Sequence, residues 1–266
     1  MGIRNVFRKN SAKKIMVVAT GMLLVIFVLA LLYHNWGLFV ISVEPDLQME
    51  GFIISETEDF ENPKIKLFGE ALEECNNITF NSLPEDVDAY EGEHNGENYV
   101  AYTFFLKNGG ENDMDYRYEL VIDEVSKGVD DAAWIMLFVN GKATIYAKGR
   151  TDGTPERIYN YLGYEKLSQF EADGQTNVIS DTYEGYITDA DLEQYRYLEK
   201  NGLHEFVTVP FESAQCVVSG NREQLKPDEI DKFTIVLWLE GNDPECVDEI
   251  KGGVLGLGMK FTKTNE

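Results

Sequence analysis

The sequence has few of the residues on which disulfide-built, nucleic-acid-binding or metal-dependent proteins rely. It contains three cysteines, three histidines and seven prolines among 266 residues. Three cysteines are too few for a disulfide-rich small fold, and seven prolines leave no Pro-rich stalk. Bases are scarce too, because 23 Lys and Arg face 47 Asp and Glu, for a net charge of −24. This charge repels phosphate backbones, so we expect no nucleic-acid partner.

Common catalytic motifs are missing from the sequence as well. It contains no His-Glu-x-x-His zinc motif and no Gly-x-Ser-x-Gly nucleophile elbow. Gly253, Gly256 and Gly258 have the reverse spacing of a dinucleotide-binding loop and predict a small-residue final strand. Neighbouring acids such as Asp130 and Asp131 arise by chance in so acidic a chain. We therefore expect no enzyme, no catalytic residue and no cofactor. Weak Ca²⁺ binding by loop carboxylates is an alternative for which the sequence indicates no position.

The longest uncharged run lies near the N-terminus, at residues 15–33. As a helix these nineteen residues would be about 28 Å long, close to the hydrocarbon thickness of a bilayer. Five bases and no acid lie in residues 1–14, so the other 18 bases face all 47 acids and the rest of the chain carries −29. The positive-inside rule then predicts a cytoplasmic N-terminus and an extracellular C-terminal part.

This charge step divides the chain into four predicted parts. They are a cytoplasmic basic tail (1–14), a single-pass signal-anchor helix in the cell membrane (15–33), a short linker (34–44) and an extracellular domain (45–264). Cleavage after Ala30 is the alternative, because Val28 and Ala30 form a small-residue exit site. The apolar run continues through Tyr33, which favours an uncleaved anchor.

The extracellular part has the pattern of a β protein. Short β-branched and aromatic runs are bounded by Gly, Asn and Asp. Asn140-Gly141 is the strongest hairpin signal, since both central positions of a type I′ turn need positive φ. We predict an all-β fold, an antiparallel β-sandwich of jelly-roll or immunoglobulin-like type. The expected strands are 65–68, 99–107, 116–123, 134–139, 142–147, 205–210, 215–219, 233–239 and 254–261.

Three further features refine this prediction. Short helices are expected at 68–75 and 189–200, and an insertion is expected within 148–204. Strand 233–239 is apolar on both faces, which predicts a central strand with Trp238 buried.

The segment 225–246 has the sequence LKPDEIDKFTIVLWLEGNDPEC. It resembles a stretch near the end of some TasA/camelysin-like surface proteins of Gram-positive bacteria. The resemblance covers about 22 of the 266 residues. It implies a jelly-roll-like domain exported to the cell surface, in some members assembled into matrix fibres.

The three cysteines would lie on the oxidising side of the membrane. Cys216 falls in a predicted strand, and Cys246 follows strand 233–239 through a loop, so the two enclose one hairpin. We predict a Cys216–Cys246 disulfide with Cys75 left over. Three reduced, buried thiols are the alternative.

Together these features predict a non-enzymatic, membrane-anchored extracellular protein of the cell surface or matrix. Its expected partners are the membrane, through the N-terminal helix, and other matrix subunits or a surface glycan. A glycan- or calcium-binding surface module is the first alternative. A hydrolase whose carboxylates meet only in three dimensions is the second.

Overall fold

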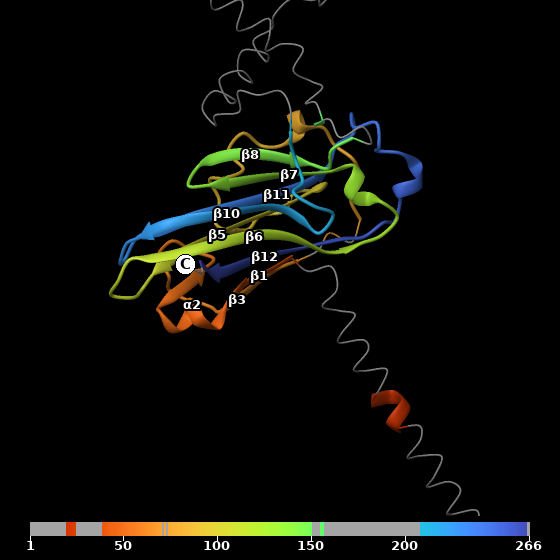
Figure 1. The fold of residues 1–266 in the computed structure, drawn as a ribbon. Helices are drawn as coiled ribbons and strands as arrows, with labels where there is room; N and C mark the ends of the chain where they lie inside the picture. Colours follow the sequence, from red (N-terminus) through yellow and green to blue (C-terminus); the bar gives the residue numbers. More distant parts are fainter. Residues whose placement is uncertain are drawn as a thin grey trace, which may run out of the picture.

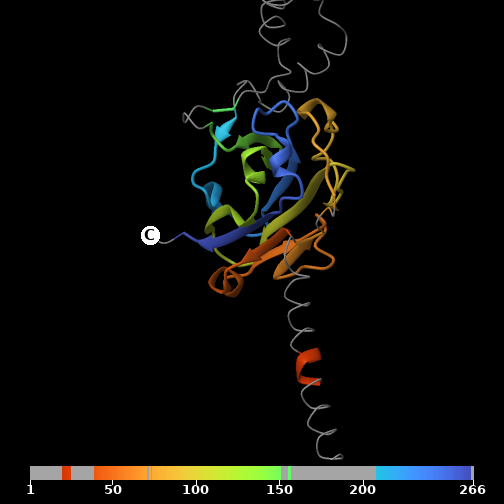
Figure 2. The same ribbon diagram turned by 90° about the vertical axis from the view of Figure 1, so that its right-hand side faces the viewer.

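The all-β prediction is confirmed by the computed structural model, in which two β-sheets face each other (Figure 1). It describes residues 20–24, 39–70, 72, 74–150, 155–156 and 208–264. Figure 2 shows the two layers after a 90° turn, with the blue C-terminal strand beside the orange N-terminal ones. The chain crosses repeatedly from one sheet to the other, so residues far apart in sequence share one core.

Sheet A has five strands and contains both the first and the last strand of the fold. β1 lies between β12 and β3, and it pairs with β12 in parallel and with β3 antiparallel. The order across sheet A is β10 (Cys216–Leu225), β6 (Met114–Val125), β12 (Leu255–Lys263), β1 (Phe39–Val43) and β3 (Lys66–Gly69).

Sheet B has seven strands, and β11 lies at its centre between β5 and β7. Its order is β2 (Phe52–Ser55), β5 (Tyr99–Asn108), β11 (Ile230–Leu239), β7 (Ala133–Val139), β8 (Lys142–Ala147) and β9 (Val209–Pro210), with β4 (Gly92–Glu93) on β5. β8 and β9 pair in parallel. The predicted antiparallel sandwich thus also contains two parallel strand pairs, β1–β12 and β8–β9.

The predicted boundaries of strands and turns agree with the structure where the local signal was strong. Asn140 and Gly141 have φ values of 52° and 78° and connect β7 to β8, as the hairpin signal predicts. The turn at 109–113 connects β5 to β6, which lie in different sheets, so this turn is a sandwich corner.

Three of the described strands, β1, β2 and the two-residue β4, were not predicted. β1 lies within the expected linker 34–44, so the sandwich begins at Phe39 rather than at residue 45. β2 was also missed. The helix predicted at 68–75 is wrong, because β3 continues to Gly69 and the described residues that follow are not helical. Pairing with β1 holds this segment extended, and it buries Leu67.

The remaining helical elements are single turns or slightly longer. They are α2 (Pro45–Met49), η1 (Phe80–Ser82), η2 (Val129–Asp131) and η4 (Asp248–Ile250). Residues 20–24 of the predicted membrane segment are helical. Within the described ranges, no helix has the length and apolar character needed to span a bilayer. The rest of segment 15–33, the helix predicted at 189–200 and most of the insertion predicted at 148–204 lie outside the described residues.

The core between the sheets is aromatic at one end. Phe104 stacks on Phe233 with ring centroids 5.5 Å apart, and Phe261 meets Phe233 edge-on, also at 5.5 Å. Phe52 and Tyr116 complete this group at 5.2 Å. Edge-to-face pairs of this kind add stability beyond their buried area.

A second apolar cluster covers the outer face of sheet B. Trp134 of β7 and Trp238 of β11 lie side by side there, with ring centroids 6.1 Å apart. Phe80 and Val87 cover them from the segment after β3. β11 thus has buried apolar residues on both faces, among them Phe233 and Ile235 on one and Val236 and Trp238 on the other. The predicted burial of Trp238 in a central strand is confirmed at 1% exposure.

Candidate functional site

The loop that follows β11 is fixed by the two tryptophans. Trp238 Nε1 donates to Glu240 Oε2 at 3.0 Å, and Trp134 Nε1 donates to Asp243 Oδ2 at 2.7 Å. Glu240 also accepts from the backbone N–H of Phe80 at 2.9 Å. A buried indole N–H needs an acceptor, so these two acids position residues 240–245 against the end of sheet B.

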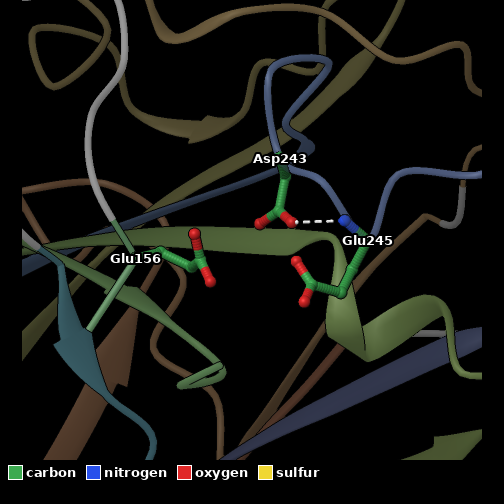
Figure 3. Close-up of side chains that lie close together, drawn as sticks. All are labelled: Glu156, Asp243 and Glu245. Atoms are coloured by element: carbon green, nitrogen blue, oxygen red, sulfur yellow. Dashed lines mark hydrogen bonds between the residues drawn. The ribbon is translucent and has the colours of Figure 1, made fainter. Parts of the chain in front are cut away.

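This arrangement brings three carboxyl groups together. Oxygens of Glu156, Asp243 and Glu245 lie within 4.8 Å of one another. Figure 3 shows the three side chains pointing toward a common centre, Glu156 from one segment and the other two from the loop after β11. Asp243 Oδ1 accepts from the Glu245 N–H at 2.9 Å. Glu156 and Asp243 are only 1% and 4% exposed.

The positive charge facing these carboxyl groups comes from Arg150. Its Nε and Nη2 donate to the two Glu156 oxygens at 2.9 and 3.1 Å. Glu245 Oε2 is buried and has no hydrogen-bond partner among the described residues. Among the described residues, three ionised carboxylates beside this one guanidinium would leave two negative charges uncompensated in a poorly solvated place, which is costly.

The electrostatics of Asp243 reflect this imbalance. Burial raises the pKa of its carboxyl group to about 7; a hydrogen bond from Trp134 opposes the rise, and the Glu245 carboxyl adds to it. Below about pH 7 the cluster therefore holds a proton on Asp243. A cation could take the place of that proton, since carboxylate oxygens are the ligands that Ca²⁺ prefers.

All three cysteines are free thiols in the structure. Cys216 lies on β10 beside Glu212, with Sγ and Oε2 3.7 Å apart. Cys246 lies after the carboxylate loop and packs against the cluster of Val129, Ala132 and Ile250. The predicted Cys216–Cys246 bond is thus not formed here. Burial raises the pKa of all three thiols.

The acid pair noted in the sequence has a structural role. Lys148 Nζ lies 2.6 Å from carboxyl oxygens of both Asp130 and Asp131. This ion pair holds η2 against the end of β8, and it agrees with the interpretation that these acids form no site of their own.

His94, between β4 and β5, lies with its ring nitrogens 2.9 and 2.8 Å from the Gly92 and Val87 carbonyls.

Sequence analysis did not identify the carboxylate cluster. Glu156 is separated from Asp243 by 87 positions, and no ligand motif connects them. Trp238 was predicted to be buried, and a buried indole N–H needs an acceptor, but the burial of Trp134 beside it was not predicted. Comparison with known proteins adds nothing to this picture, since no family model, no curated protein and no solved structure matches the chain.

Proposed function

We propose that this chain is a non-enzymatic, membrane-anchored extracellular protein that serves the cell surface or the surrounding matrix. The observation that carries the proposal is the charge step across residues 15–33, with five bases before the uncharged run and a balance of −29 after it. A β-sandwich on the far side of such a step suits an exported domain. The resemblance of segment 225–246 to matrix-associated surface proteins points the same way.

The bonding of the buried acids supports a structural role over hydrolysis. Glycoside hydrolysis needs two carboxyl groups that a substrate can reach. Glu156 is held by Arg150, and Asp243 by the Trp134 indole, and both are almost fully buried. The hydrogen bonds from Arg150 and Trp134 hold these acids in place, which supports the proposed structural role.

The finer class of the sandwich forms part of the same proposal. The connections β5–β6, β6–β7, β10–β11 and β11–β12 each pass from one sheet to the other. Crossing connections of this kind are typical of Greek-key sandwiches, to which jelly rolls and immunoglobulin-like domains belong.

The topology is tested by adding protease to intact cells or protoplasts that make the chain with tags at both ends. We expect loss of the C-terminal tag and protection of the tag on residues 1–14, because only the acidic part should face outward. Permeabilised cells, in which both tags are lost, are the control. A protected C-terminal tag contradicts the proposal, and a mature N-terminus at Leu31 would show that the anchor is cleaved.

A second candidate function, cation binding, is favoured by the unpartnered Glu245 oxygen. We propose that Glu156, Asp243 and Glu245 hold Ca²⁺ when it is abundant, as extracellular modules often do. Ca²⁺ at about 100 times its Kd should add roughly 2.7 kcal/mol to the free energy of unfolding.

The variant Glu245→Gln tests this site, because it keeps the shape and removes one charged ligand. We expect the Ca²⁺-dependent rise in melting temperature to be lost. Glu249→Gln is the matched control, since Glu249 is exposed on η4 in the same part of the chain. A rise of equal size in the wild type, Glu245→Gln and Glu249→Gln would refute the site.

A further inference from the structure

The space between the sheets is incompletely filled at the end opposite the aromatic group. Ile235, Leu237 and Leu239 point from the central strand β11 toward sheet A, yet only Ile235 is buried, at 3% exposure. Val100 of β5, which pairs with Leu237 of β11, is also only half-buried. A residue of a central strand that faces the opposite sheet is normally fully packed. These positions therefore line an opening in the sandwich.

The opening is a pocket of about 670 Å³. This volume lies within the range of small-molecule and cofactor sites. Residues from both sheets form its apolar wall, among them Phe39, Val100, Tyr102, Ile235, Leu237 and Leu257. A pocket lined in this way offers a chain-like ligand apolar surface on two sides.

Charged residues at the pocket restrict which ligand fits. Glu70, Glu74 and Asp248 lie among the lining residues, and Lys251 is the basic one. Lys251 is already paired with Asp248 at 2.6 Å, which leaves the surroundings of the pocket negative. Anionic ligands, including ionised fatty acids, are repelled by this charge. A neutral apolar ligand has no such penalty.

The position of the pocket suggests a source for that ligand. Phe39, one of the lining residues, follows Tyr33 by six residues. Six extended residues reach about 20 Å, so a membrane segment ending at Tyr33 keeps the pocket close to the bilayer surface.

We propose that this pocket binds the alkyl chain of a neutral membrane lipid. The choice of a membrane lipid rests on the proposed anchoring of the chain, whereas the pocket itself rests on the packing of β5, β11 and β12. The lipid chain would cover Leu237 and Val100 and complete the core of the sandwich.

The test is photolabelling of the full chain in lipid vesicles. The probe is a monoacylglycerol with a diazirine in its acyl chain, doped into the vesicles, and labelled peptides are mapped after irradiation. We expect label on peptides that contain Val100, Leu237 or Leu257, and unlabelled monoacylglycerol should compete for it. Label confined to residues 15–33, or label that does not compete, would overturn the proposal.

Variants at Leu237 separate pocket binding from surface contact. Leu237→Trp fills the pocket and should lower the pocket label about tenfold, whereas Leu237→Ala enlarges it and should retain the label. Val125→Trp is the control, because Val125 is 43% exposed on β6 and does not line the pocket. An unchanged rate of Cys216 alkylation verifies that each variant is folded. Equal labelling of Leu237→Trp and wild type refutes the pocket.

The same experiment distinguishes the two proposals. If the chain floats with the vesicles but is labelled only in residues 15–33, the membrane anchor is supported and the lipid pocket is refuted. If the chain does not float but the probe in buffer labels the pocket, the pocket is supported and the membrane anchor is refuted. Failure of both measurements refutes both.

Discussion

At the scale of single residues, Asp243 connects folding to pH. Its carboxyl group accepts from Trp134 and lies against two other carboxyl groups, and burial raises its pKa to about 7. An unfolded Asp titrates near 3.9. Between these values the folded chain holds a proton that the unfolded chain has lost. This group therefore makes stability fall as the pH rises from about 4 to 7.

The variant Asp243→Asn should flatten that part of the pH profile. Asn keeps an acceptor for the Trp134 indole and carries no charge, so its contribution no longer changes with pH. The free energy of unfolding in urea, measured from pH 4.5 to 7.5 with a chelator present, provides the test. Asp248→Asn is the control, because Asp248 is exposed and its pKa is lowered by Lys251. A slope unchanged by Asp243→Asn would contradict the assignment.

At the scale of elements, Asp231 connects the two sheets through one carboxylate. It lies on β11 at 1% exposure and accepts from Tyr116 of β6 at 2.7 Å and from Arg222 of β10 at 3.1 Å. Asn140, in the β7–β8 turn, donates to it as well, at 2.7 Å. The same Asn140 side chain accepts from the Lys232 N–H at 2.8 Å, so the hairpin turn is fixed to the central strand.

Removal of this carboxylate should lower the free energy of unfolding substantially. Asp231→Ala leaves the buried Tyr116 hydroxyl and the half-buried Arg222 guanidinium without this acceptor, and we expect a loss of about 3 kcal/mol in the free energy of unfolding. Asp228→Asn is the control nearby, because Asn tolerates the positive φ of 64° at this position and the lost exposed pair with Lys107 should be worth at most about 1 kcal/mol. Similar losses in the two variants would show that the network contributes no more than a surface ion pair.

The elements that were predicted correctly are those whose signal is local. The β7–β8 hairpin follows from Asn140-Gly141, and the burial of β11 follows from apolar residues on both of its faces. β1 escaped prediction because its alternation of Phe39, Ile41 and Val43 continues a longer apolar run. The false helix at 68–75 is a short helical pattern that tertiary pairing overrides. The carboxylate cluster depends on contacts across 87 residues, which no local pattern encodes.

At the scale of the whole molecule, charge of one sign dominates. With a net charge of −24, self-repulsion should destabilise the compact state at low ionic strength. Raising NaCl from about 0.01 to 0.15 M shortens the Debye length from about 30 to 8 Å, so we expect the melting temperature to rise. Near the isoelectric point of about 4.4 the effect should vanish. A melting temperature independent of salt at pH 7.5 would contradict this expectation.

The place of β12 in sheet A has a consequence for biosynthesis. β12 is synthesised after the other described strands and lies between β6 and β1, so sheet A without it separates into the pairs β10–β6 and β1–β3. Two-stranded pieces of this kind are marginally stable in water. After leaving the ribosome, β1 must therefore wait for its parallel partner β12, which begins only at Leu255. A nascent or truncated product that ends before Leu255 exposes the apolar faces of both sheets, which makes it a substrate for chaperones and proteases.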